Sequence, residues 1–108
     1  LWLRYDGQEM NDADWQNPQT KSVGLFLYGG EGEEEGEVRD HLLVLLNASH
    51  VDLPFNLPSF REQGPEGTCG RWTLLLNTAD DAAQEVVEAD QDTQLTARSI
   101  KIFSCPAQ

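Results

Sequence analysis

The chain has few of the residues that mark zinc centres, disulfide frameworks or membrane spans. Cys69 and Cys105 are its only cysteines, with no second pair to complete a metal site, so we expect two buried or idle thiols. No apolar run approaches the roughly 18 residues that a membrane span needs, and no signal-peptide pattern is visible. We therefore expect a soluble, cytoplasmic protein. A chain that begins with Leu1 lacks an initiator Met and is expected to be a fragment of a longer protein.

Basic residues are also scarce. Seven Lys and Arg face 19 Asp and Glu, which gives a formal net charge of -12. Such a charge repels phosphate backbones and anionic headgroups, so neither nucleic acid nor a membrane is an expected partner.

Recognisable catalytic motifs are absent. The sequence has no Gly-x-Ser-x-Gly elbow, no phosphate-binding glycine loop and no useful Cys–His spacing. His41 and His50 lack a third ligand at a convincing spacing, so we expect no metal site and no cofactor. Glu31–Glu37 holds five carboxylates without the spacing of a calcium loop, and we expect a mobile, solvated loop there. The chain alone is not expected to be an enzyme.

Short apolar runs predict an all-β fold, namely an antiparallel β-sandwich of about six to eight strands. Central strands are expected where both faces are apolar, and Pro54 favours an edge position for its strand because proline cannot donate to a β-ladder. The predicted strands are Val23–Tyr28, Leu42–Leu46, Val51–Leu57, Trp72–Asn77 and Leu95–Ser104.

Three places remain open. Asp80–Ala89 fits either a helical turn capped by Asp80 or a strand at Val86 and Val87. Arg98 shares the phase of apolar residues, which indicates a β-bulge or a paired guanidinium at the sheet end. Asn47 begins an Asn-Ala-Ser glycosylation pattern, but it also ends a strand-like run, and we favour the structural role.

The first 20 residues predict a small ribbon and a short helical turn. Asp6-Gly7 between strand-like runs is a strong hairpin signal. Asn11 or Asp12 can cap a helical turn near Asp12–Trp15, which Pro18 would end. We expect Trp15 to pack inward or against a neighbouring domain.

Several segments resemble the region after the catalytic barrel in isoamylase-type glycogen debranching enzymes, which belong to the alpha-amylase superfamily and are here taken to be bacterial. The resemblance covers most of the chain, apart from the acidic segment and Asp80–Ala89. The similar segments are Trp2–Met10 with Asp14 and Trp15, Ser22–Gly29, Leu43–Ala48 with His50, Pro54–Pro58, Trp72–Asp80 and Ala97–Ile100.

This resemblance implies a single C-terminal β-sandwich domain over residues 1–108, with residues 1–20 as a hairpin and linker from the barrel. The parent enzyme would hydrolyse α-1,6 branch linkages in glycogen, and its catalytic carboxylates would lie in the barrel, so no catalytic residue is assigned here. The expected partner is that barrel, which the domain would stabilise or cover. The alternative is a carbohydrate-binding module for α-glucan. Contacts to the barrel or to glucan are expected at Trp2, Tyr5 and Trp15.

Overall fold

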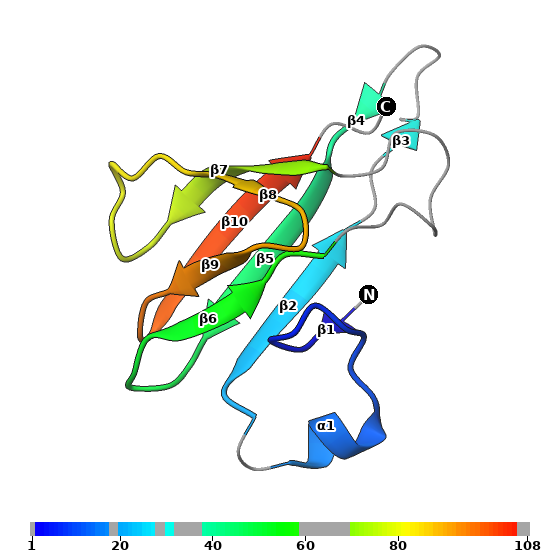
Figure 1. Ribbon diagram of the computed structural model, residues 1–108, viewed down its shortest axis with the longest axis vertical. Helices are drawn as coiled ribbons and strands as arrows, with labels where there is room; N and C mark the ends of the chain where they lie inside the picture. The colour runs from blue at the N-terminus through cyan, green and yellow to red at the C-terminus, as the bar shows by residue number, and fades with distance from the viewer. Residues whose placement is uncertain (1, 18–19, 28–29, 32–37, 59–69, 106–108) are drawn as a thin grey trace.

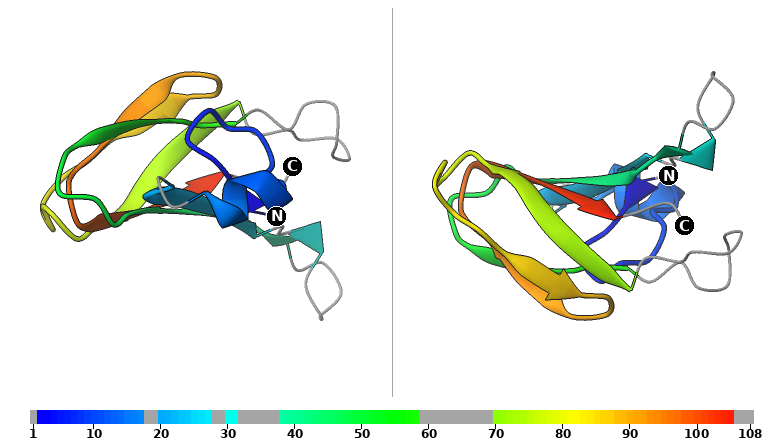
Figure 2. Two further views of the ribbon diagram at one scale, coloured as in Figure 1. Left: turned by 90° about the horizontal axis from the view of Figure 1, so that it is seen from below. Right: turned by 90° about the horizontal axis from the view of Figure 1, so that it is seen from above.

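Eight strands with alternating side chains form two antiparallel sheets that face each other (Figures 1 and 2). The computed structural model describes residues 2–17, 20–27, 30–31, 38–58 and 70–105. The large sheet has the order β1-β2-β5-β10-β7-β8 and the small sheet pairs β6 with β9. Their bounds are β1 Trp2–Leu3, β2 Ser22–Leu27, β5 His41–Asn47, β6 Leu53–Asn56, β7 Arg71–Asn77, β8 Val86–Glu88, β9 Asp92–Leu95 and β10 Ser99–Cys105. The predicted all-β sandwich is confirmed.

Two smaller elements complete the described chain. β3 (Gly30–Glu31) pairs with β4 (Val38–Arg39), and the five-residue helix α1 spans Asp12–Gln16. The prediction of a mobile loop over Glu31–Glu37 concerns residues 32–37, which lie outside the described residues. Neither α1 nor any other helix in the described ranges is long and apolar enough to cross a membrane.

The core lies between the two sheets and is dominated by aromatic rings and leucines. Trp72 is fully buried, and its indole N–H donates a 3.0 Å hydrogen bond to the Pro58 carbonyl, so burial leaves no unsatisfied donor. Phe26 meets Trp72 edge to face. The remaining buried apolar members are Leu3, Leu43, Leu45, Phe55, Leu57, Val87, Leu95, Phe103 and Cys105.

Gly24 lets the two sheets approach closely. A Cβ at this position of β2 would lie 3.0 Å from Phe55 Cζ and 3.2 Å from Leu45 Cδ2. Contacts this short are rare for real side chains, so a larger residue at position 24 would have to displace Phe55 of β6. Pro54 is exposed on β6, which pairs with β9 alone among the described strands, so its predicted edge position is confirmed.

Asn47 has a structural role at the end of β5. It is fully buried, and its Nδ2 donates 2.9 Å hydrogen bonds to the carbonyls of Val51 and Leu95. Its Oδ1 accepts a hydrogen bond from the Ser49 backbone N–H. The amide nitrogen that a glycan would need is therefore engaged inside the fold.

The last predicted strand is wrong as a single element. Residues 92–95 form β9 in the small sheet, and the chain then turns and enters β10 in the large sheet. Arg98 lies in that turn with φ 54°, directly before Ser99 begins β10, so it lies at the end of the sheet and the predicted β-bulge is wrong. A sandwich requires the chain to change sheets, and residues 96–98 contain no glycine or proline that would mark the turn between the two strands.

Of the two alternatives for Asp80–Ala89, the structure shows the strand. Val86–Glu88 form β8, paired with Arg71–Thr73 of β7, and Val87 faces the core opposite Trp72.

The expectation of an idle thiol is wrong for Cys105, whose sulfur is disulfide-bonded. Thiol pairing depends on approach in space, which spacing along the chain does not reveal. Cys69 lies outside the described residues.

Candidate functional site

The most distinctive surface of the described chain is the side of the large sheet that faces away from the core. Alternation on β2, β5 and β10 buries one set of side chains and leaves the other partly or largely exposed. We call the second set, together with two flanking residues, the outer face. Its members are Trp2, Val23, Leu25, Leu27, Leu42, Val44, Leu46, Leu76, Ile100, Ile102 and Ser104.

Strand register aligns apolar side chains of the outer face in one row. Antiparallel neighbours pair Trp2 with Leu25, Leu25 with Val44, Val44 with Ile102, and Ile102 with Leu76. Directly opposed side chains on one face of a sheet lie in contact distance of each other. The row therefore crosses five strands without a polar interruption.

The outer face contains no charged residue although the protein is strongly acidic. On the same side of the large sheet, charge is found at the β7–β8 edge, where Arg71 and Glu88 form an ion pair at 3.0 Å. Ser104 is the single polar member of the outer face, and no Asp, Glu, Lys or Arg belongs to it. The outward side of the small sheet differs, because Pro54 and Asn56 lie opposite Gln94 and Asp92 there. An antiparallel sheet normally has one solvated, polar side, so the aliphatic outer face indicates a surface that another body covers.

A β-bulge in β7 increases the exposed apolar surface where the row of the outer face ends at Leu76. Ile102 pairs with Leu76 and Phe103 with Leu74, which leaves Leu75 as an extra residue on β7. Bulges re-aim the side chains of the strand that carries them. Leu75 and Leu76 are consecutive yet both exposed, with 60% and 44% of their surface accessible.

Trp2 and Trp15 mark the opposite end of the row. Their ring centroids lie 5.5 Å apart with an interplanar angle of 82°, an edge-to-face pair. They keep 46% and 53% of their surface exposed. Edge-to-face rings stabilise each other, but perpendicular rings do not form one flat platform for stacking successive sugars. The expectation that Trp15 packs inward does not hold.

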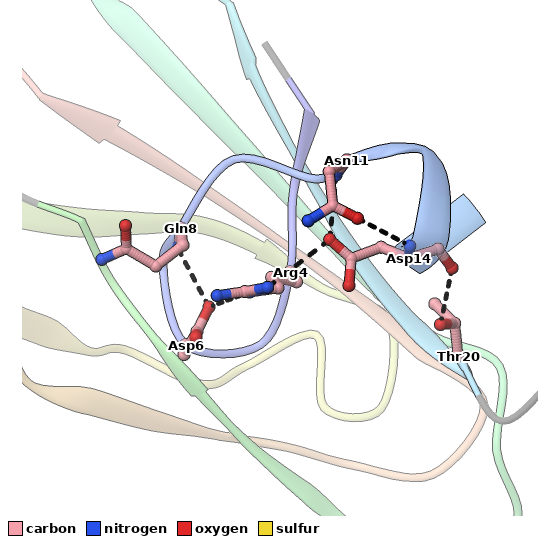
Figure 3. A network of polar contacts seen from close by, with 6 residues as sticks. All are labelled: Arg4, Asp6, Gln8, Asn11, Asp14 and Thr20. Carbon is pink, nitrogen blue, oxygen red and sulfur yellow. Dashed lines mark hydrogen bonds and ion pairs between the residues drawn. The ribbon is translucent and has the colours of Figure 1, made fainter. Parts of the chain in front are cut away.

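A polar network fixes the segment that carries these two rings (Figure 3). Asn11 caps α1 by accepting a hydrogen bond from the Asp14 N–H, and the Asp14 carboxylate accepts from the Asn11 N–H, each at 2.9 Å. This reciprocal capping box satisfies donors that a helix start leaves open. The Thr20 hydroxyl donates to the Asp14 carbonyl at 2.9 Å, which ties the end of α1 to the chain before β2.

Arg4 joins the capping box to the preceding turn. Its Nε donates to Asp6 Oδ1 at 2.9 Å, and its Nη1 lies 3.6 Å from Asp14 Oδ2. The same Asp6 oxygen accepts from the Gln8 N–H at 3.1 Å. The hydrogen bond from Arg4 holds the pKa of the Asp6 carboxyl below its usual value, while partial burial opposes this effect. The turn takes its sharp shape at Gly7, where φ is 82°.

Tyr5 does not join the tryptophan pair through any described contact. Its ring is 61% exposed, and its carbonyl accepts a 2.8 Å hydrogen bond from the Asn56 N–H of β6. The turn that carries Tyr5 therefore packs along the small sheet. Of the three predicted contact residues, Trp2 and Trp15 form a ring pair, and no described contact joins Tyr5 to them.

No reactive cluster competes with the outer face as a site. Within the described ranges, no group of three or more His, Cys, Asp or Glu side chains could hold a metal ion. His41 lies at the start of β5 against Phe26, with ring centroids 5.6 Å apart, and burial lowers its pKa although Asp40 opposes the shift. His50 is exposed.

Sequence reasoning found the exposed tryptophans and the two-sided apolar strands, but it missed the extent of the outer face. The pattern that indicates the outer face was present in the sequence, because Leu42, Val44 and Leu46 alternate with residues that the structure buries. The bulge at Leu75 had no readable signal, because it depends on the register between β7 and β10.

Two comparisons with known proteins concern the family of the chain. No curated protein matches the chain. The sequence model of the family described as isoamylase, C-terminal, matches residues 1–105, nearly the whole chain. The chain therefore belongs to the isoamylase C-terminal domain family.

Proposed function

We propose that this chain is the non-catalytic C-terminal domain of a glycogen debranching glycosidase and that it stabilises the catalytic barrel of its parent. Family membership supports a parent glycoside hydrolase. Hydrolysis of a glycosidic bond needs two carboxylic groups held at a defined separation across the sugar. The chain belongs to a family of C-terminal domains, so we assign the chemistry, cleavage of α-1,6 branch linkages, to the rest of the parent.

The observation that carries the stabilising role is the outer face. Covering a half-exposed leucine contributes about 1 kcal/mol, and Leu27, Leu46 and Leu76 of the outer face have between 38% and 45% of their surface exposed, while their neighbours in the sheet are less exposed. A partner that covers the row would therefore gain several kcal/mol of apolar contact. We further propose that residues 1–108 are one domain and that residues 1–20 lead into it from the barrel.

The cellular compartment of the parent is not fixed by the family. A cytoplasmic, bacterial origin stays a prediction. The disulfide at Cys105 weighs against the cytoplasm, because reducing compartments keep most thiols unpaired.

The proposal is tested by removing residues 1–108 from the parent enzyme. We expect the truncated parent to lose α-1,6 hydrolysis at a lower temperature than the intact enzyme, and we expect the chain alone not to cleave branched glucan. Half-lives of activity at several temperatures measure the first effect, and release of reducing ends measures the second. A truncated parent with unchanged half-lives would contradict the stabilising role.

The alternative is binding of α-glucan through Trp2, Tyr5 and Trp15. Their exposure favours it, whereas the perpendicular rings of Trp2 and Trp15 oppose it. Titration of the chain with maltoheptaose, followed by tryptophan fluorescence, distinguishes the two functions. We expect no saturable change, and a saturable change that disappears in Trp15→Ala would favour glucan binding.

A further inference from the structure

We infer that residues 2–17 form a strap that closes one side of the sandwich and opens as a unit while the two sheets stay together. This inference concerns the chain itself and does not depend on the proposed function. Its first ground is the position of the strap. β1 pairs with β2 in the large sheet, and the turn after β1 reaches the small sheet, where the Tyr5 carbonyl accepts a 2.8 Å hydrogen bond from the Asn56 N–H of β6 (Figure 2). The strap therefore joins both sheets at one side of the core.

The second ground is that the strap is held together from within. The Met10 N–H donates to the Trp2 carbonyl and the Arg4 N–H to the Gln8 carbonyl, both at 2.9 Å, so backbone hydrogen bonds close the turn. The side chain of Arg4 ties this turn to α1, and the edge-to-face tryptophan pair adds a second tie to α1 (Figure 3). A segment linked in this way opens cooperatively.

The third ground is that the strap contributes little to the contact between the sheets. β1 has two residues, whereas β5 and β10 have seven each. Leu3 is the side chain that the strap adds to the core cluster. Phe26, Phe55 and Trp72 of that cluster belong to β2, β6 and β7, so they hold the two sheets together without the strap. A segment with little buried apolar surface opens at a lower free energy than the core strands.

The test is backbone hydrogen–deuterium exchange of the intact chain, followed by nuclear magnetic resonance in low concentrations of urea. Two adjacent amides decide the result, because the Asn56 N–H is bonded to the strap and the Leu57 N–H to the Gln91 carbonyl before β9, at 2.9 Å. We expect Asn56 to exchange with the same opening free energy as Met10 of the strap. Leu57 should follow the slow amides of β5 and β10, at least roughly tenfold slower than Asn56.

A pair of variants tests whether the Arg4 side chain keeps the strap closed. Arg4→Met removes the contacts that link the turn to α1, and it should raise exchange at Met10 and Asn56 together by roughly five- to tenfold. Exchange at β5 should stay as in the wild type. Arg71→Met is the matched control, because it removes an ion pair of the same kind, from Nε to a carboxylate at 3.0 Å, outside the strap. It should leave Met10 and Asn56 unchanged.

Three results would overturn the inference. If Asn56 exchanges together with Leu57, the strap opens only when the sandwich unfolds. If Met10 and Asn56 exchange with different opening free energies, the segment frays residue by residue. If Arg4→Met and Arg71→Met have equal effects at both amides, the Arg4 side chain does not hold the strap. Should Arg4→Met fail to fold, the comparison of Asn56 with Leu57 in the wild type still decides.

Discussion

Lys101 Nζ lies 2.8 Å from Glu85 Oε1 in the interior of the sandwich. The ammonium group also donates to Thr93 Oγ1 at 2.9 Å, and that hydroxyl donates to Glu85 Oε2 at 2.7 Å. Lys101 belongs to the large sheet and Thr93 to the small one, so the network joins the two layers across the core. Lys101 is almost completely buried, whereas Glu85 keeps contact with solvent.

This difference in burial predicts unequal effects of the two single substitutions. Glu85→Gln leaves a buried ammonium without its counter-charge and should lower the free energy of unfolding by about 1–3 kcal/mol. Lys101→Met removes the buried charge and keeps the side-chain volume, so it should cost about 1 kcal/mol or less. Urea unfolding of both variants measures the order. A greater loss in Lys101→Met would contradict this account.

Gly24 and Gly70 provide a matched pair for the close approach of the sheets. Gly24→Ala should destabilise the chain by about 1–3 kcal/mol, because the new methyl group would meet Phe55 and Leu45. Nothing lies within 4 Å of a Cβ at Gly70, so Gly70→Ala should stay within about 0.5 kcal/mol of the wild type. Thermal unfolding followed by circular dichroism compares them, and equal effects would show that the contact at Gly24 is unimportant.

His41 predicts a dependence of stability on pH. Burial lowers its pKa in the folded chain, so the unfolded chain takes up a proton first as the pH falls through the ordinary value of 6.5. The free energy of unfolding should therefore fall from pH 7.5 towards pH 5, and part of this fall should be absent in His41→Gln. His50→Gln, at an exposed position, should keep the wild-type slope. Equal slopes in all three proteins would contradict the prediction.

The capping box predicts that Asp14 orders the tryptophan pair. Asp14→Ala removes the partner of the Asn11 N–H and the ion pair with Arg4, at a cost of about 1 kcal/mol, and should weaken the near-ultraviolet dichroism of the pair. Asp12→Ala removes the same charge from the same turn but keeps the capping box. Its near-ultraviolet spectrum should match the wild type. Identical spectra for both variants would show that Trp15 is held by other contacts.

The sequence predicted those parts of the fold that depend on local pattern. The predicted strand Leu42–Leu46 lies within β5, and the predicted strand Trp72–Asn77 lies within β7, because an apolar run of that length has few other stable conformations. The helical turn near Asp12–Trp15 was also predicted, with either Asn11 or Asp12 as its cap, and the structure shows that Asn11 is the cap.

The parts that sequence reasoning missed depend on contacts between distant segments. The turn at Arg98 has no glycine or proline to announce it, and the disulfide at Cys105 depends on approach in space. The bulge at Leu75 is a mismatch of register between two strands far apart in the chain. For the site, Trp2 and Trp15 were predicted as contact residues, but only the assembled sheet shows that Trp2 continues a row ending at Leu76.

The large sheet ends in very short strands, β1 with two residues and β8 with three. A long free edge would offer unpaired backbone groups to a strand from another molecule, and short edges deny that template. If the domain is released from its parent, clustering should therefore proceed through side chains meeting face to face, without growth of a continuous hydrogen-bonded ladder. Such clusters should disperse on dilution and should not seed cross-β fibrils.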